Sequence, residues 1–366
     1  MSTLNDLWTK GGQSPWLDNL RRDWIRDGEL ARWLDRGVRG VTSNPSIFQK
    51  AITGAAVYDE QFHSLMAAGT SVDDAYWELV ITDITDALAI LRPVYEESNG
   101  LDGFVSLEVA PSLAHDTAGT VRAARALHDR IAQPNLYVKI PGTAAGIGAI
   151  RDVVAGGGSV NVTLLFSVER YDEVIEAYLS GLEACDGPLD QVSSVASFFV
   201  SRVDGEIDKR LTAIGSPEAL ALRGKAAVAN AQLAYGLFLE RFRGPRWDAL
   251  AARGARVQRP LWASTSTKDP SYPATLYVDT LIAPDTVNTM PEGTLEAFEA
   301  SGTVARTADA DLVGARQIIE QLQAVGIDLA DVTGKLEADG VASFATAFDE
   351  LIASLQQMAD DLTRRV

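Results

Sequence analysis

The stretch Asn135-Leu-Tyr-Val-Lys-Ile140 decides the fold expected for this chain. Successive side chains of a β-strand point to opposite faces, so Tyr137 and Lys139 share one face and the three aliphatic residues share the other. A parallel strand that is covered on both faces is normally an almost continuous apolar run. A lysine inside such a strand therefore requires a special environment.

Three further strand-like stretches, 38–44, 103–109 and 159–164, also alternate between polar and apolar residues. The polar residues that share a face in these stretches are Gly40, Thr42 and Asn44, then Ser106 and Glu108, then Asn161 and Thr163. Four strands with one polar face each do not suit an open parallel sheet that is covered by helices on both sides.

Short β-like runs recur along the chain and alternate with helical stretches. The eight predicted strands are 14–19, 38–44, 103–109, 135–140, 159–166, 192–199, 257–264 and 275–281. The predicted helices include 73–95, 118–131, 144–154, 168–184, 217–243 and 293–300. Eight strands that alternate with helices predict a closed (β/α)8 barrel. We expect residues 1–366 to form a single domain, with 309–366 as extra helices packed on the outside of the barrel.

In such a barrel the apolar strand faces meet the helices and the polar faces point into the lumen. A barrel lumen is normally filled with branched aliphatic side chains. Lysine, glutamate, asparagine and threonine near the carboxyl ends of the strands therefore indicate an active site there.

Lys139 is the candidate nucleophile. A lone lysine near a strand end usually points to solvent, but Lys139 lies between Val138 and Ile140 on a central strand. Burial favours the neutral form of an amine, and a neutral amine is the form that attacks a carbonyl. Asp18 and Glu108, near the ends of their own strands, are candidate proton carriers, although such carboxylates are often surface groups. Their charges oppose the effect of burial on the lysine, and the sequence does not decide which effect dominates.

Trp262-Ala-Ser-Thr-Ser-Thr-Lys-Asp269 offers hydroxyls and an ammonium group after the seventh predicted strand. The loops that follow strands seven and eight of such barrels are frequent phosphate sites, so Ser264, Ser266 and Lys268 are candidates for binding an anion. The alternative is an ordinary polar turn. Arg202 follows the sixth strand and is a second candidate cation, because a guanidinium group can bind phosphate with two hydrogen bonds.

Composition narrows the function further. A formal net charge of −18 disfavours nucleic acid and anionic membranes as partners. The sequence has no apolar run long enough to span a bilayer and no secretion signal at its start, so we expect a cytoplasmic protein. The single cysteine, Cys185, and the three histidines lack the spacing of a metal site, and no metal is expected.

The chain resembles the transaldolase family, in particular its longer actinobacterial and plant type. The segments that carry the resemblance are Trp16-Leu-Asp18, Thr42-Ser-Asn-Pro-Ser-Ile-Phe48, Val105-Ser-Leu-Glu-Val109, Leu136-Tyr-Val-Lys-Ile-Pro141, Asn161-Val-Thr-Leu-Leu-Phe-Ser167, Ser194-Val-Ala-Ser-Phe-Phe-Val-Ser-Arg-Val-Asp204 and Thr286-Val-Asn-Thr-Met-Pro291.

This resemblance implies a cofactor-independent transfer of a dihydroxyacetone unit between sugar phosphates, through a Schiff base on Lys139. It also implies that Asp18 is the acid and base of carbon–carbon cleavage, and that Glu108 and Thr163 hold a water that carries protons. The residues that it assigns to the substrate are Asn44, Asn161 and Ser197 for the sugar, and Arg202 and Ser264 for the phosphate.

The chain departs from the family pattern at two places. Many members have an arginine where this sequence has Ser266, and Lys268 is the candidate replacement. Members also commonly have aspartate two residues after the strand-three glutamate, whereas here Glu108 is followed by Val109 and Ala110. Because of the first departure, the sequence does not decide how the phosphate is bound or which donor sugar is preferred. The second departure predicts the loss of a peripheral ion pair, with catalysis intact.

Two alternatives to a transaldolase remain at this stage. One is a related enzyme that mainly cleaves or forms fructose 6-phosphate with free dihydroxyacetone. The other is a barrel that binds sugar phosphates without catalysis, which the presence of the lysine, both carboxylates and the amides makes the weaker alternative. Composition does not choose between a monomer and a homodimer.

Overall fold

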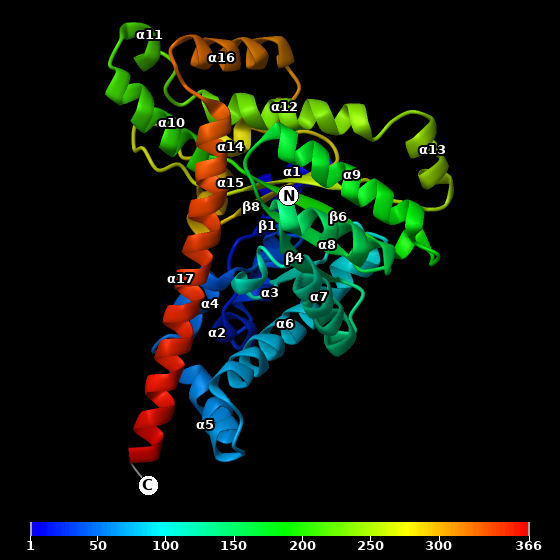
Figure 1. The fold of residues 1–366 in the computed structure, drawn as a ribbon, viewed down its shortest axis with the longest axis vertical. Helices are drawn as coiled ribbons and strands as arrows, with labels where there is room; N and C mark the ends of the chain where they lie inside the picture. The colour runs from blue at the N-terminus through cyan, green and yellow to red at the C-terminus, as the bar shows by residue number, and fades with distance from the viewer. Residues whose placement is uncertain (1, 365–366) are drawn as a thin grey trace.

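The computed structural model describes residues 2–364 and closes eight parallel strands into a barrel (Figure 1). The strands are β1 (Gln13–Leu17), β2 (Val41–Thr42), β3 (Val105–Glu108), β4 (Leu136–Pro141), β5 (Val160–Leu165), β6 (Ser194–Phe199), β7 (Arg259–Ala263) and β8 (Thr286–Met290). Each strand pairs with its neighbour in the sequence, and β8 pairs with β1. The predicted (β/α)8 barrel is confirmed.

Helices cover the outside of the barrel. They are α1 (Thr3–Thr9), α2 (Arg22–Arg26), α3 (Glu29–Arg36), α4 (Pro45–Ile52), α5 (Asp59–Ala67), α6 (Val72–Glu97), α7 (Thr117–Ile131), α8 (Ala144–Ala155), α9 (Val168–Ala184), α10 (Ser201–Ile214), α11 (Pro217–Leu220), α12 (Ala226–Arg241), α13 (Pro245–Ala252), α14 (Leu276–Asp279), α15 (Glu292–Ser301), α16 (Leu312–Ala324) and α17 (Leu329–Arg364). Side-chain caps start several of them, among them Asp116 for α7, Thr143 for α8 and Ser167 for α9.

The predicted helix 217–243 is wrong in one respect, because it is divided into α11 and α12. Gly224 lies between them with a φ of +72°, in the left-handed region that interrupts a helix. Its backbone N–H donates to the Asp208 carboxylate, which holds the break in place.

The predicted eighth strand is also wrong. Residues 275–281 contain helix α14, and the strand that closes the barrel is β8, whose five residues pair with β1 from Gln13–Thr286 to Leu17–Met290. A short apolar run fits either a buried strand or a helical turn, so its periodicity alone is ambiguous. The helical turn is held by the Tyr277 hydroxyl, which donates to buried Asp204, and by the Thr275 hydroxyl, which donates to Asp279.

Aromatic side chains fill the lumen below Lys139. Tyr137, two residues before Lys139 on the same face of β4, stacks on Phe104 and Trp16 with ring centroids 4.0 and 6.1 Å away. Gly40 is required here, because a Cβ atom at this position would collide with the Trp16 indole. Three stacked aromatic rings therefore fill the lumen on the amino-terminal side of Lys139.

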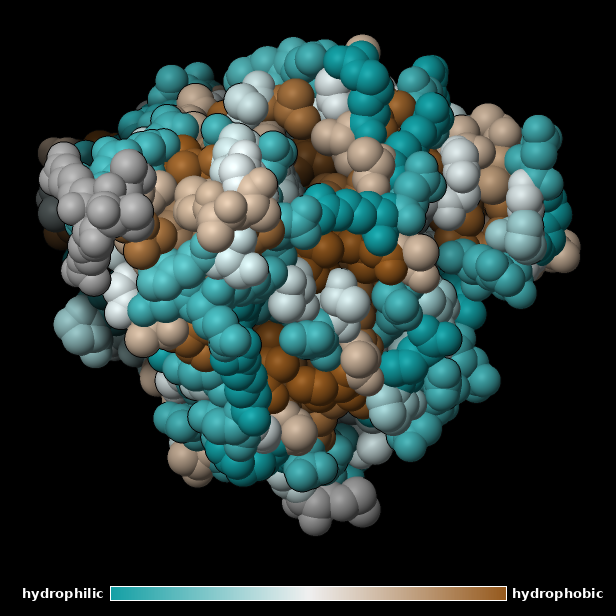
Figure 2. Space-filling model, turned by 90° about the horizontal axis from the view of Figure 1, so that it is seen from below, coloured by the Kyte–Doolittle hydropathy of each residue, from teal (hydrophilic) through white to brown (hydrophobic). Residues whose placement is uncertain are grey.

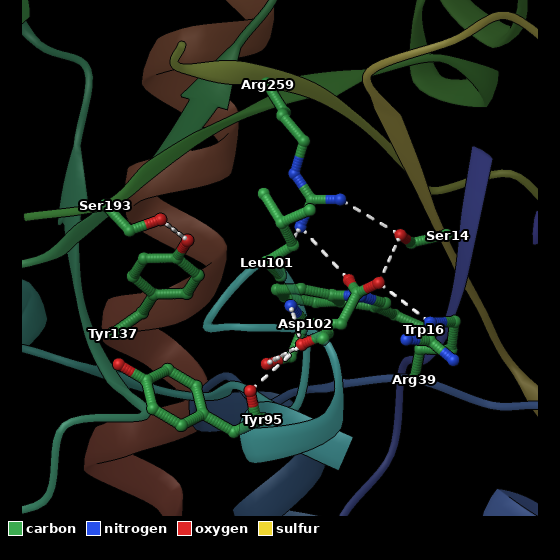
Figure 3. A network of polar contacts seen from close by, with 10 residues as sticks. Ser14, Trp16, Arg39, Tyr95, Leu101, Asp102, Tyr137, Ser193 and Arg259 are labelled. Atoms are coloured by element: carbon green, nitrogen blue, oxygen red, sulfur yellow. Dashed lines mark hydrogen bonds and ion pairs between the residues drawn. The ribbon is translucent and has the colours of Figure 1, made fainter. Parts of the chain in front are cut away.

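A buried ion network lies at the amino-terminal end of the strands (Figure 3). Fully buried Asp102 accepts hydrogen bonds from Arg39 and Ser14 at 2.8 Å, from Arg259 at 3.1 Å and from Trp16 at 3.2 Å. Burial alone would raise the pKa of Asp102, but the charges of Arg259 and Arg39 hold this pKa below its usual value. The network joins β1, β7 and the residues just before β2 and β3.

The last two helices pack against different parts of the molecule. Helix α16 contacts α12, whereas α17 contacts α4, α6, α10 and β5. Figure 1 shows α17 as one long helix that runs from the region of α10 and α14, past α4, toward α5. The C-terminal segment therefore lies against the barrel along much of its length.

Hydrophilic residues dominate the face in Figure 2, and its hydrophobic residues gather in recesses between them. Within residues 2–364, no helix is long and apolar enough to cross a membrane.

We predict that Asp102→Asn lowers the free energy of unfolding by about 3–5 kcal/mol, because it leaves Arg259 buried without its counter-charge. Urea unfolding followed by circular dichroism measures this loss. The wild-type advantage should be complete above about pH 4 and shrink at lower pH, because a carboxyl with a depressed pKa loses its stabilising charge as the pH falls through that pKa.

The exposed pair Lys10–Asp6 provides the control. Asp6→Asn should cost on the order of 0–1 kcal/mol, as is usual for surface ion pairs. Equal losses for the two variants would contradict a structural role for the Asp102 network.

Candidate active site

A pocket of about 310 Å³ opens at the carboxyl ends of the strands. This volume is at the lower end of the range for small-molecule sites. The predicted site residues that line it are Asp18, Asn44, Lys139, Thr163, Ser197, Arg202, Ser264, Ser266 and Lys268, and Thr42, which was predicted only to face the lumen, lines it as well. The structure thus brings together residues from β2, β4, β5 and β6, from the segments that follow β1, β2 and β7, and from the start of α10.

Lys139 lies at the inner end of this pocket and is only 4% exposed. Its Nζ donates a hydrogen bond of 2.9 Å to the Ser43 backbone carbonyl and lies 3.3 Å from Glu108 Oε2. Glu108 and Lys139 are partners in the register between β3 and β4, so the closed sheet holds the carboxylate beside the amine.

Glu108 does not line the pocket itself, but stands behind Lys139 with 6% of its surface exposed. Burial raises the pKa of Glu108, and the neighbouring Lys139 charge opposes this rise. Glu108 is therefore the carboxyl group that lies within proton-transfer distance of the Lys139 amine.

Thr163 lies on the pocket wall with its hydroxyl oxygen buried and without a hydrogen-bond partner among residues 2–364. Nearly all buried polar groups in proteins have a partner, so this hydroxyl is available for a substrate or a water molecule.

Asp18 follows β1 and accepts a hydrogen bond of 2.7 Å from the Thr42 hydroxyl. Burial raises the pKa of the Asp18 carboxyl, while the Thr42 hydrogen bond and the Lys139 charge act in the opposite direction. The same Thr42 hydroxyl lies 2.6 Å from the hydroxyl of Thr289 on β8. Thr42 on β2 and Thr289 on β8 thus hold the Asp18 carboxyl in place at the pocket.

Asn161 lies beneath the pocket wall and is fully buried. Its amide nitrogen donates to Ser106 at 3.0 Å, and its oxygen accepts from Ser197 at 2.7 Å. Ser197 lines the pocket, so Asn161 fixes the direction of a hydroxyl group that a ligand can reach. Asn44 lines the pocket directly, and its side-chain oxygen accepts the Ile47 N–H as the cap of α4.

Cationic side chains outnumber carboxylates in the lining of the pocket. Four of its residues, Lys50, Lys139, Arg202 and Lys268, carry a basic group, against the single carboxylate of Asp18. Such a local excess of positive charge attracts an anionic ligand to a chain whose net charge is −18.

Arg202, at the start of α10, makes no hydrogen bond or ion pair with its side chain within the described part of the chain. Burial lowers the pKa of its guanidinium, which lies 5.1 Å from the centre of the Phe199 ring. The charges of Asp18 and Asp339 oppose this lowering, but neither carboxylate makes an ion pair with Arg202 within residues 2–364. A half-buried guanidinium whose N–H groups are not paired directly suits an anionic ligand.

The segment after β7 is also shaped for a ligand. Ser264 has a φ of +56°, an unfavourable conformation for a serine, and its hydroxyl lies 2.8 Å from that of Ser201. Residues held in such conformations cluster at binding and active sites. Lys268 donates a hydrogen bond of 2.7 Å to Ser266, so these two residues form one polar unit on the pocket rim.

Sequence reasoning missed several residues that line the pocket, namely Ser46, Ile47, Lys50, Phe199, Thr289 and Phe344. Thr289 was missed because the eighth strand was assigned to the wrong segment. Phe344 belongs to α17, far along the chain from the barrel strands, and its sequence neighbourhood carries no signal of a site.

Among residues 2–364, no group of three or more histidine, cysteine, aspartate or glutamate residues is arranged to hold a metal ion.

Fold and site together define a (β/α)8 barrel with a buried lysine at the end of β4, flanked by two carboxyl groups and faced by cationic side chains. The sequence matches the model of the family described as Transaldolase/Fructose-6-phosphate aldolase over residues 15–355, and the chain belongs to this family.

Relatives of similar length support this assignment. A protein named transaldolase from Parafrankia sp. (strain EAN1pec) is 51% identical over 359 residues, which cover 97% of each chain. A transaldolase from Saccharopolyspora erythraea is 52% identical over 368 residues, or 98% of this chain and 99% of the relative. A transaldolase from Mycobacterium bovis (strain BCG / Pasteur 1173P2) is 49% identical over 355 residues, or 95% of each chain.

We predict that Thr42→Val raises the pKa of the Asp18 carboxyl further, because it removes the hydrogen bond that stabilises the carboxylate form. An NMR titration of the Asp18 carboxyl carbon measures the change. Thr163→Val makes the same substitution elsewhere in the pocket, without a hydrogen bond to Asp18, and should leave this pKa in place. An unchanged or lower Asp18 pKa in Thr42→Val would refute the proposed role of the hydrogen bond.

Proposed function

We propose that this protein is a transaldolase of the pentose phosphate pathway. It transfers a dihydroxyacetone unit from sedoheptulose 7-phosphate or fructose 6-phosphate to glyceraldehyde 3-phosphate or erythrose 4-phosphate. The observation that carries the proposal is the enclosed Lys139 amine, beside Glu108, at the inner end of a pocket that is rich in cationic groups. The relatives named transaldolase over nearly the whole chain support it.

In this proposal Lys139 attacks the ketose carbonyl as a neutral amine. Glu108 first takes a proton from the Lys139 ammonium group, which leaves the amine neutral. The carbonyl oxygen then receives two protons, one from the attacking nitrogen and one from Glu108, and leaves as water to yield the iminium ion. A water held by Glu108 and Thr163 relays these protons. The unpartnered hydroxyl of Thr163 supports this role.

The Asp18 carboxylate then accepts the proton of the hydroxyl on the carbon that leaves. The carbon–carbon bond breaks, its electron pair moves toward the iminium nitrogen, and the aldose phosphate departs from an enamine on Lys139. The acceptor aldehyde adds to the enamine with the proton of Asp18, and hydrolysis releases the product. The iminium ion is the electron sink, so this sequence of steps requires no cofactor.

We assign the remaining residues of the pocket to the substrate. Asn44 and Ser197, the latter oriented by Asn161, bind the hydroxyls of the dihydroxyacetone unit. Arg202, Ser264, Ser266 and Lys268 bind the phosphate, and the Lys268–Ser266 hydrogen bond supports their joint action where many relatives have an arginine.

A second candidate is an aldolase that releases free dihydroxyacetone from fructose 6-phosphate. The description of the matching family names both activities, and this observation keeps the aldolase as an alternative. We further propose that residues 1–366 act as one domain. A cytoplasmic location, the absence of nucleic-acid partners, and a monomeric or homodimeric state stay predictions from the sequence.

The Schiff base is tested by borohydride reduction in the presence of fructose 6-phosphate, followed by peptide mass mapping. We expect a covalent adduct on Lys139, and Lys139→Ala should lose the adduct together with transfer activity. Lys50→Ala removes another lysine of the same pocket and should still form the adduct. Turnover in Lys139→Ala, or an adduct on another lysine, would overturn the assignment.

Product analysis separates the two candidate activities. With fructose 6-phosphate alone, a transaldolase should release little dihydroxyacetone, because the unit stays bound to Lys139 as the enamine until an acceptor aldehyde adds. Addition of erythrose 4-phosphate should then produce sedoheptulose 7-phosphate and glyceraldehyde 3-phosphate in equal amounts. Steady release of dihydroxyacetone at a similar rate with and without acceptor would favour the aldolase.

A further inference from the structure

The C-terminal helix α17 places an aromatic side chain in the pocket. Phe344 is 3% exposed and lines the pocket together with Lys139 and Arg202. The centre of its ring lies 5.9 Å from the Arg202 guanidinium carbon and 6.0 Å from the Lys139 amine nitrogen. One ring from the end of the chain thus faces both principal cations of the site.

Helix α17 approaches the barrel closely at this point. A Cβ atom at Gly340, one turn before Phe344, would lie 2.9 Å from the Leu164 side chain and 3.6 Å from an Arg202 guanidinium nitrogen. Leu164 has a φ of +60° within the irregular end of β5, and it is buried. The glycine on the helix and the unusual backbone of β5 together allow Phe344 to reach the pocket.

The Arg202 guanidinium lies between two aromatic rings, Phe199 at 5.1 Å and Phe344 at 5.9 Å. Within residues 2–364 its side chain has no hydrogen bond or ion pair, although the charges of Asp18 and Asp339 act on it, and the two rings are its close contacts with a π face. A cation over a ring face is attracted by the ring quadrupole, while the N–H groups at the edge of the guanidinium plane stay free for an anion.

We propose that Phe344 is a positioning residue for the substrate phosphate, acting through the guanidinium of Arg202. This proposal rests on the proposed function, in which Arg202 binds the phosphate of the sugar. Recognition of phosphorylated substrates then depends on the docking of α17 as well as on the barrel strands and loops.

Phe344→Leu and Phe344→Tyr test the proposal, since leucine keeps an apolar side chain without a ring face and tyrosine keeps the ring. For fructose 6-phosphate, loss of the ring should raise KM about fivefold, as expected for one partly desolvated cation–π contact, with little change in kcat. Phe344→Tyr should restore KM. With unphosphorylated fructose, which has no group for Arg202, Phe344→Leu should match the wild type.

Phe348→Ala is the matched control. Phe348 lies one turn further along α17 and packs edge-on against Tyr76, with ring centroids 5.1 Å apart, outside the pocket that holds Lys139. This variant weakens the same helix, so it should change stability without changing the preference for fructose 6-phosphate over fructose.

Calorimetric titration with inorganic phosphate gives a readout that does not require turnover. Phe344→Leu should weaken phosphate binding by a factor similar to the rise in KM, and Phe344→Tyr should not. Equal losses with both sugars, equal effects of leucine and tyrosine, or unchanged phosphate binding would overturn the proposal. Intact phosphate effects in a protein without transfer activity would instead count against the proposed function alone.

Discussion

The site is organised around the Lys139 amine, which is buried beside the Glu108 carboxyl with Nζ and Oε2 3.3 Å apart. Burial penalises the charged form of each group, while their mutual attraction favours both charges together. The raised pKa of Glu108 shows that burial is the larger influence on this carboxyl. In the proposed reaction one proton passes from Lys139 to Glu108, and the 3.3 Å separation of Nζ and Oε2 places the two groups for this transfer.

A polar lumen has a structural consequence, because branched aliphatic residues normally fill this space and stabilise the barrel. Here the stabilising groups are shifted toward the amino-terminal end. The rings of Trp16, Phe104 and Tyr137 close the lumen directly beneath the lysine, and the Asp102 network ties the strand starts together (Figure 3). The two ends of the barrel are therefore specialised, one for stability and the other for chemistry, which allows the upper lumen to hold charged groups.

Alternation along single strands was enough to predict that Lys139, Tyr137 and Thr163 face the lumen, since side-chain direction in a strand is a local property. It failed at 275–281, where the same apolar spacing suits a helical turn and contacts with Asp204 hold α14. Tertiary features had no local signal. The hydrogen bond from Thr42 to Asp18 joins neighbouring strands, and the left-handed backbone of Leu164 lies where Gly340 of α17 approaches β5. Phe344 belongs to α17, whose amphipathic pattern predicts that one face of the helix is buried but does not predict which part of the barrel this face contacts.

Helix α17 contributes an aromatic ring beside the Arg202 guanidinium. A guanidinium that must bind phosphate should have no protein counter-ion, because a carboxylate partner would compete with the ligand. Aromatic rings solve this problem, since they attract the cation without occupying its N–H groups. Phe199 on β6 supplies one ring, and Phe344 on α17 supplies another. In our proposal the anion side of the pocket is therefore complete only once α17 has docked.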